Sequence, residues 1–512
     1  MFFRKRKQRV DNSQISTEHL SKSLQENIRI FKESLFHGDE AIVYREFRTA
    51  APKPRDCIII CAENMVTHQY ISEFVLRPMM VRSISSKSKN ESLIRYIMEN
   101  VIQTDRIEEQ GELMTLADAV YNGASIILVN GCNKAIVVEA EGWETRSISE
   151  PKSEQVIRGP RQGFVEELAI NLTLVRRKLK STSFKVKNLQ VGTESKTRVA
   201  VIYLEDVVQE GLVQNVIDKI KGIQIDGILD SGYIEELIKD SPNNPLPTIG
   251  NTERPDVVAA RILEGRVAVL VDGTPFALTM PYLFMEAFQA NEDYFSHWIP
   301  GSFHRSLRYI CFAITTITPA LWLSLGSYDP QLLPTKLVLA MAASRKLVPF
   351  PALIEVLAMG LVFEILREGG LRLPQPVGEA MSIVGAIVLG DAAVRANLVS
   401  APMIVVVAIT AVSGFVIPDL YDTAVIARLT LVLMASLFGI YGMLLGIMGM
   451  VLLLASMHSF GVPYLSSLAS FGAQNMKDTA IRAPWWSMRL RPQFIGSKNR
   501  KRLNNKDKGN QS

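Results

Sequence analysis

Three uncharged, apolar runs in the second half of the sequence constrain the fold more than any other feature. They cover residues 309–328, 401–418 and 429–457 of the 512-residue chain. A helix of about 20 apolar residues crosses a hydrocarbon core of about 30 Å, and the first run is twenty residues long. The third run is longer than one crossing needs. These runs predict a transmembrane domain over residues 309–460.

Two further segments of this domain resemble membrane helices but carry charge. One contains Glu355 and Glu364, and the other lies between Glu379 and Asp391. A charged side chain at mid-bilayer costs roughly 2.5–3.5 kcal/mol, so it usually faces a protein interior or a water-filled path. The four carboxylates are therefore candidates for lining a polar membrane path. Glu355 has apolar residues on both sides, which favours this role, whereas for Glu379 and Asp391 a solvated, inert position at headgroup depth is equally open.

The two ends of the chain are basic, and this sets the expected topology. Residues 4–9 hold five Lys or Arg and no acid, and the residues after Met476 hold ten Lys or Arg against two Asp. Basic segments beside apolar helices mark the cytoplasmic side of a membrane, and we prefer this interpretation to nucleic-acid binding. The start carries no secretory signal. Both ends are thus expected in the cytoplasm, with four full crossings and one charged segment re-entrant or interfacial; five membrane helices are the alternative.

The segment after residue 366 has a helix-breaking sequence. Pro374 and Pro376 end the preceding helix because proline cannot continue its hydrogen bonds. Irregular backbone at membrane depth persists only where protein or a cavity covers it. Residues 367–394 therefore look like a broken hairpin inside an assembly.

Four glycines near the end of the domain fall on one face of a predicted helix. Two of them make a GxxxG motif, which is typical of close helix–helix contacts in membranes. The surface predicts a helix partner, in the same chain or in another one. Its members are Gly439, Gly442, Gly446 and Gly449.

The residues before the membrane domain carry most of the charge and alternate between helical and strand patterns. After a basic start and an amphipathic helix that Ser16 could cap (residues 1–50), we expect two α/β subdomains, at residues 51–155 and 156–281. A hairpin is predicted at Asp272–Gly273. The expected fold class is therefore a soluble α/β region with two subdomains, followed by an all-α multi-pass membrane domain of about four to five helices.

Two segments flank the membrane domain. Residues 282–308 mix aromatic and charged side chains, and Phe295, Trp298, Phe303 and the adjoining Tyr309 could lie at the headgroup level, with ordinary linker aromatics as the alternative. Residues 461–512 form a basic cytoplasmic tail.

The sequence shows no motif that supports an enzyme. It lacks a P-loop, a GxGxxG after a strand, HExxH and GxSxG, so we predict neither catalysis nor a cofactor. Cys57 and Cys61 share one face of a predicted strand, but without a second pair core packing is the default over a metal site. Arg158, Gly159 and Arg161 lie near a predicted helix start and could hold an anion; the alternative is a solvated contact loop between the subdomains.

Three long stretches resemble one protein family. They are residues 150–180, 250–295 and 364–418, which read EPKSEQVIRGPRQGFVEELAINLTLVRRKLK, GNTERPDVVAARILEGRVAVLVDGTPFALTMPYLFMEAFQANEDYF and EILREGGLRLPQPVGEAMSIVGAIVLGDAAVRANLVSAPMIVVVAITAVSGFVIP. Together they are similar to the A subunits of GerA-type spore germinant receptors of endospore-forming bacteria. The resemblance covers nearly the whole chain after about residue 35.

The resemblance implies partners and a location. A subunits work with a B subunit that resembles amino-acid transporters and with a C subunit that is a lipoprotein, in the spore inner membrane. Nutrients trigger the complex, and germination begins with the release of monovalent cations. A subunits would form a homo-oligomer around a pore, as a ligand-gated channel, and the nutrient pocket is usually placed in the B subunit.

Under this resemblance the charged, proline-broken segment lines or supports a shared conduction path, where a ring of carboxylates would favour cations. Arg367, Glu368 and Arg372 would form an elbow at the cytoplasmic boundary, just before the two prolines. Two alternatives stay open. One is a non-conducting membrane scaffold of the receptor, and the other is a stand-alone secondary transporter, against which the chain shows too few crossings and no visible inverted repeat.

Overall fold

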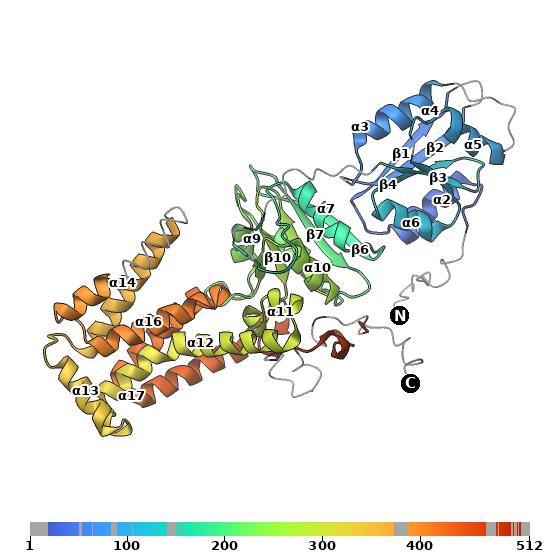
Figure 1. Ribbon diagram of the computed structural model, residues 1–512. Helices are drawn as coiled ribbons and strands as arrows, with labels where there is room; N and C mark the ends of the chain where they lie inside the picture. The colour runs from blue at the N-terminus through green and yellow to red at the C-terminus, as the bar shows by residue number, and fades with distance from the viewer. Residues whose placement is uncertain are drawn as a thin grey trace, which may run out of the picture. The chain divides into compact units, whose positions relative to one another are not determined.

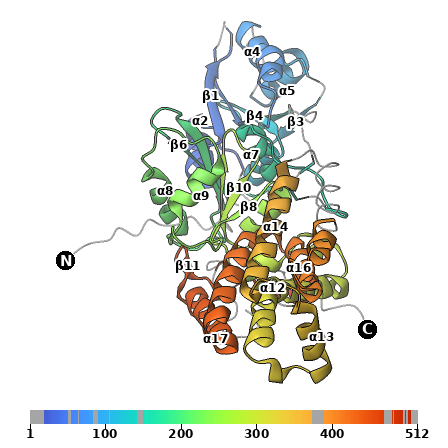
Figure 2. The same cartoon turned by 90° about the vertical axis from the view of Figure 1, so that its left-hand side faces the viewer.

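The computed structural model describes residues 19–50, 54–63, 65–82, 90–104, 106–140, 150–151, 153–154, 156–372, 388–466, 478–479 and 481–492, and the single positions 495, 499, 501 and 502. The chain divides into two compact units (Figures 1 and 2). The sheet unit comprises Met1–Lys239, Ile249–Pro281 and Leu490–Ser512, and the helical unit comprises Asp240–Thr248 and Tyr282–Arg489. Each unit is described by itself below.

The first subdomain of the sheet unit is an antiparallel sheet with helices on both faces. Its strand order is β1-β2-β4-β5-β3. Alternate residues of β2 (Asp56–Ala62) face opposite sides: Cys57, Ile59 and Cys61 pack with α4 and α5, and the residues between them pack with α2 and α6. Because both faces of β2 are buried, its sequence is continuously apolar. The other elements are α2 (Leu24–Ile30), β1 (Ile42–Arg48), α3 (His68–Tyr70), α4 (Arg77–Val81), α5 (Asn90–Asn100), β3 (Ile107–Gln110), α6 (Leu113–Tyr121), β4 (Ala124–Val129) and β5 (Ala135–Glu139).

The second subdomain is also an antiparallel sheet, with strand order β6-β7-β9-β10-β8. Asp230 caps α9 by accepting a hydrogen bond from the backbone N–H of Gly232 at 2.9 Å, and the predicted hairpin at Asp272–Gly273 is confirmed as the turn between β9 and β10. The elements are α7 (Leu168–Lys178), β6 (Phe184–Val191), β7 (Thr197–Leu204), α8 (Leu212–Lys221), α9 (Ser231–Ile238), β8 (Gly250–Thr252), α10 (Pro255–Leu263), β9 (Val267–Val271) and β10 (Ala277–Met280).

The two subdomains repeat one topology, down to single hydrogen bonds. In the first, the Asn27 side chain accepts from the backbone N–H of Ser21 at 2.9 Å and donates to its carbonyl at 2.6 Å. In the second, Asn171 does the same to Val165, at 2.8 Å and 2.5 Å. Both asparagines are buried, and each occupies the fourth residue of the helix that precedes its sheet.

A second matched pair lies in the turn between the last two strands of each sheet. Gly131 and Gly273 both have a left-handed backbone, with φ of 90° and 92°. The Gly131 N–H donates to the carbonyl of Lys22 at 3.0 Å, and the Gly273 N–H donates to that of Glu166 at 2.7 Å. The sequences that lead into these turns, NGASIILVNG and EGRVAVLVDG, share the same glycine spacing and a common Leu-Val. We conclude that the sheet unit is an internal duplication.

The two copies meet at a buried ion pair. Nη2 of Arg176 lies 3.0 Å from Oδ2 and 3.1 Å from Oδ1 of Asp39, and both side chains are almost fully excluded from solvent. The guanidinium lies over the rings of Tyr121 and Phe184, one from each copy. Removing one partner of such a pair leaves a buried charge and typically costs about 3–5 kcal/mol, so this contact holds the two subdomains together.

Among the described residues, the helical unit has two helical elements that are long and apolar enough to cross a membrane, and the second has a backbone break at Phe438 and Gly439. They are Trp298–Ser327 and Pro418–Ser456, and Ala401–Phe415 is apolar but shorter. The expected four to five membrane helices therefore stay a prediction. The main elements are α11 (Glu292–Phe295), α12 (Trp298–Ser327), α13 (Thr335–Arg345), α14 (Ala352–Arg372), α16 (Ala401–Phe415) and α17 (Tyr421–Ser456).

The amphipathic helix expected within residues 1–50 differs from its prediction. The described helix α2 begins at Leu24 rather than near Ser16, which lies outside the described residues. His19 instead forms a β-bridge with Glu112, so the chain is extended just before the helix. The apolar positions Leu20, Leu24 and Phe31 are buried as the spacing predicts.

The duplicated asparagines give a matched test of this fold. Asn27→Ala and Asn171→Ala should each lower the free energy of unfolding by about 1–3 kcal/mol, because each leaves a buried backbone N–H and C=O unpaired. Thermal unfolding of the full-length protein in detergent measures the effect. Asn188→Ala, at an exposed strand position, is the control, with an expected change within about 0.5 kcal/mol. Destabilisation by only one of the two substitutions would contradict the equivalence of the two contacts.

The cysteines of the first subdomain give a pH-dependent test. Burial raises the pKa of Cys57 to about 12 and that of Cys61 to about 11. A raised thiol pKa keeps the unreactive S–H form below that value. We expect both cysteines to resist a thiol reagent at pH 8 in the folded protein and to react fully after denaturation. Mass mapping of the labelled peptides checks this, and rapid native labelling of Cys57 would show that the strand is not buried.

Candidate functional site

Glu355 lies in the first turn of α14 and is 2% exposed. Its Oε2 accepts hydrogen bonds from the backbone N–H of Ser400 at 3.1 Å and from the Ser400 hydroxyl at 2.9 Å. Nε of Arg345 lies 3.4 Å from Oε1. One carboxylate thus connects the end of α13, the start of α14 and the residue before α16, and its buried charge is compensated.

Glu364 lies two to three turns further along α14 and connects it to α17. Its Oε1 accepts from the Tyr421 hydroxyl at 3.0 Å and from Nη2 of Arg428 at 2.7 Å. Arg367 completes the group: its Nη1 lies 3.7 Å from Oε2 of Glu364, and its guanidinium stacks on the Tyr421 ring, 3.3 Å from the centroid. The predicted elbow residue Arg367 is therefore part of this network.

A cavity of about 320 Å³ adjoins the Glu364 network. Side chains of α12, α14, α16 and α17 line it, and almost all of them are apolar. The polar exceptions are Glu364, Thr410 and Arg428. Charged groups in an apolar surrounding usually mark a functional path in a membrane protein, and this cavity combines space with charge in that way.

The other predicted polar residues lie elsewhere. Asp391 is exposed and forms an ion pair with Arg395 at 2.8 Å. Glu368 and Arg372 pair with each other at 2.6 Å on an exposed face at the end of α14. Glu379, Pro374 and Pro376 lie outside the described residues. The structure thus brings neither Asp391 nor Glu368 into the Glu355 and Glu364 networks.

The predicted anion loop pairs with a local carboxylate. Arg161 lies 3.3 Å from Glu150, and both side chains are exposed. Arg158 is exposed, and Gly159 has φ of 139°. Glu150 thus supplies the negative charge that pairs with Arg161. This arrangement is the one described by the alternative to an anion site, a solvated contact loop.

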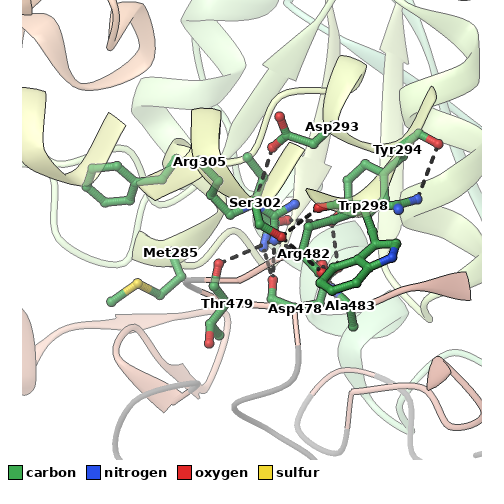
Figure 3. Close-up of polar contacts among 12 residues, drawn as sticks. Met285, Asp293, Tyr294, Trp298, Ser302, Arg305, Asp478, Thr479, Arg482 and Ala483 are labelled. Carbon is green, nitrogen blue, oxygen red and sulfur yellow. Dashed lines mark hydrogen bonds and ion pairs between the residues drawn. The ribbon is translucent and has the colours of Figure 1, made fainter. Parts of the chain in front are cut away.

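Sequence reasoning missed the largest charged cluster of the helical unit, which is centred on Arg305 (Figure 3). The Arg305 side chain is fully buried in α12. Its Nε lies 3.2 Å from Asp293, and its Nη1 lies 2.9 Å from Oδ1 and 2.7 Å from the carbonyl O of Asp478. Arg308 also contacts Asp293, at 2.8 Å, and burial raises the pKa of Asp478 although Arg305 opposes the shift. The mixture of charged and aromatic residues in 282–308 could have indicated this cluster. Asp478, the partner of Arg305, is however remote in sequence.

The predicted glycine surface lies partly on a helical hairpin. The backbone of α17 breaks at Phe438 and at Gly439, whose φ and ψ are 60° and −139°. Beyond the break, a Cβ on Gly446 would lie 2.7 Å from Leu431; along a straight helix these positions would be about 22 Å apart. The chain therefore folds back, and α17 consists of two limbs, residues 421–437 and 440–456.

The four glycines consequently have three different roles. Gly439 is in the turn rather than on the expected helix face, because its backbone is not helical there. Gly442 and Gly446 face the first limb, where their Cβ atoms would collide with Met434 and Leu431. Gly449 has open space around it. The closely packed partner is thus the same helix element.

The described residues contain no group of three or more His, Cys, Asp or Glu side chains that could hold a metal ion. The helical unit does contain carboxylates paired with arginine at Glu355, Glu364 and Asp293, and Glu364 also lines an apolar cavity. Such ion pairs fix the arrangement of the helices that supply them.

A sheet-rich, duplicated unit joined to an apolar helical unit defines the class of protein. The family model described as "Bacillus/Clostridium GerA spore germination protein" matches residues 29–494. The chain belongs to this family. Its role is therefore in spore germination, as a member of a family that includes germinant receptor A subunits.

Relatives cover nearly the full length of the chain. Spore germination protein KA of Bacillus subtilis (strain 168) is 37% identical over 94% of this chain and 88% of its own. Spore germination protein GerQA of Bacillus cereus is 36% identical, over 94% of both chains. The crystal structure of the N-terminal domain of the A subunit of the Bacillus megaterium spore germinant receptor GerK3 is 30% identical and covers 52% of this chain and 98% of its own, with a TM-score of 0.41.

The hairpin gives a matched pair of glycine substitutions. Gly442→Ala should destabilise the protein by about 1–3 kcal/mol, because the new Cβ would overlap the Met434 backbone and force the limbs apart. Gly449→Ala, in open space on the same limb, should change stability little or raise it, since alanine favours helix by about 1 kcal/mol. Thermal unfolding in detergent checks both. Equal, small effects would contradict the tight hairpin.

Proposed function

We propose that this chain is the A subunit of a nutrient germinant receptor in the spore inner membrane. In this proposal it spans the membrane several times with both ends in the cytoplasm, and it assembles with a transporter-like B subunit and a lipoprotein C subunit. It has no enzymatic activity. Copies of the chain form an oligomer, and the oligomer is a ligand-gated channel for monovalent cations.

The observation that supports conduction is the placement of charge on α14. Glu355 and Glu364 lie in residues 352–366 of α14, which are otherwise apolar, and Glu364 lines the apolar cavity. Carboxylates at membrane depth are costly, and rings of them favour cations when several copies surround a pore. When the channel opens, release of either carboxylate from its arginine would expose a negative charge to the conduction path.

One observation favours a second function, a non-conducting scaffold. Glu355 already has Ser400 and Arg345 as partners, and Glu364 already has Tyr421 and Arg428. Each carboxylate thereby holds two or three helices together. In the scaffold proposal these contacts build the receptor, and another protein of the complex conducts.

Nutrient-triggered cation release from spores that carry this receptor operon alone separates the two functions. We would compare the intact gene, an in-frame deletion, Glu355→Gln and Glu368→Gln. The channel proposal expects no release after deletion, and release slowed by about tenfold or more in Glu355→Gln, corresponding to about 1.4 kcal/mol on the barrier. Glu368→Gln is the matched control, because this carboxylate is exposed on the same helix.

Receptor level must be measured in the same spores. Normal levels of Glu355→Gln receptor with slowed or less cation-selective release support conduction through this chain. Reduced receptor level with unchanged release per receptor supports the scaffold instead. Equal release with and without the gene would contradict both proposals.

A further inference from the structure

In the first turns of α12, apolar side chains are exposed and a charged side chain is buried. On one face, Ile299, Phe303, Leu307 and Ile310 are exposed, at spacings of four, four and three residues, and Phe303 is 67% exposed. On the opposite face Arg305 is buried completely, between Asp293 and Asp478. A helix on a water-facing surface shows the reverse arrangement, with apolar side chains inward and charge outward.

A second segment, residues 481–489, has the same inverted arrangement. Ile481, Trp485 and Trp486 point outward, and Trp486 is 67% exposed. Arg482 between them is buried, with its guanidinium 5.8 Å from the centroids of both the Tyr294 and Trp485 rings. A tryptophan pair exposed beside a buried arginine is costly in water, since it leaves apolar area solvated while a charge is desolvated.

The two inverted surfaces are attached to each other. The Ser302 hydroxyl of α12 lies 3.3 Å from the Arg482 carbonyl O, and Nη1 of Arg305 bonds to Asp478 and to the Thr479 carbonyl just before the segment (Figure 3). The buried charges therefore fix residues 481–489 against the start of α12. The exposed apolar side chains of these two attached segments are called the patch below, and its members are Ile299, Phe303, Ile481, Trp485 and Trp486.

The length of α12 places this patch relative to a membrane. Its 30 residues extend about 45 Å, and a hydrocarbon core is about 30 Å thick, so about ten residues must lie outside the core. Both charged residues that α12 carries, Arg305 and Arg308, lie in its first eleven residues. The residues of α12 that lie outside the hydrocarbon core are therefore at the start of the helix, which is the end that carries the patch.

We propose that the patch is a lipid-binding surface and that Trp485 and Trp486 lie in the phospholipid headgroup layer, where they anchor the start of the C-terminal tail. Three observations select lipid rather than protein as the occupant. The patch is on a helix of membrane-crossing length, tryptophan is the residue enriched at membrane–water interfaces, and an exposed Arg489, a residue type that attracts anionic headgroups, follows the pair. The inference rests on the membrane location in the proposed function and does not depend on conduction.

Depth-dependent quenching of tryptophan fluorescence tests the proposal. The full-length protein would be reconstituted in phosphatidylcholine–phosphatidylglycerol vesicles with bromine either near the headgroup end or near the tail end of the acyl chains. The chain has five tryptophans, so the contribution of the pair is the difference between the intact chain and Trp485→Phe/Trp486→Phe. We expect headgroup-end bromine to quench this contribution about twofold more than tail-end bromine. A variant that keeps Trp322 alone, within the second half of α12, is the control for insertion.

The outcomes separate this inference from the proposed function. If tail-end bromine fails to quench Trp322, α12 does not cross the membrane and the membrane location itself is wrong. If Trp322 is quenched but the pair is quenched only by aqueous iodide, the patch faces water and the lipid-binding surface is refuted. Protection of the pair from both bromine and iodide would also refute it, and would show that a protein surface, such as a second copy of the chain, covers the patch.

Discussion

The burial of arginine beside carboxylate is the constraint on which the helical unit depends. Arg305 is fully enclosed by Asp293 and Asp478, and Arg428 holds Glu364 between two helices. A buried charge without a partner would cost several kcal/mol, so each pair fixes the position of the elements that supply it. Because these charges are inside, large apolar side chains of the same helices, such as Phe303, Leu361 and Leu437, are left exposed. Exposed apolar side chains of this size are costly in water, and an apolar environment would remove that cost.

The sheet unit uses the same kind of buried ion pair at the joint between its two copies. Asp39 comes from the first copy and Arg176 from the second, and the aromatic rings of Tyr121 and Phe184 enclose the guanidinium. Within each copy, stability comes instead from strands buried on both faces and from the asparagine that ties its helix to the preceding chain. The duplication therefore supplies two similar cores, and the ion pair determines how they are joined.

The sequence predicted those features that have a local cause. The apolar strand with Cys57 and Cys61 and the turn at Gly273 each follow from neighbouring residues. The duplication was missed because its copies share only short, separated matches, which are the helix starts LQEN and LAIN, spaced glycines and a Leu-Val pair. The break at Gly439 was missed because an uncharged apolar run gives no sign of where its backbone reverses. The Arg305 cluster needs Asp478, and only the folded chain brings these two residues together.

Helix α17 connects the Glu364 network to a loop that lies between two sheet-unit elements in the sequence. Its first limb carries Tyr421 and Arg428, which hold Glu364 of α14, and also Thr423, whose hydroxyl lies 3.1 Å from the carbonyl O of Pro245. Pro245 belongs to the short loop Asp240–Thr248, which is part of the helical unit although α9 and β8 of the sheet unit flank it in the chain. The second limb contacts the same loop, since Met457 at its end accepts from Asn244. The same helix element therefore holds both Glu364 of α14 and the loop 240–248, so these two contacts of the helical unit depend on one another through the position of α17.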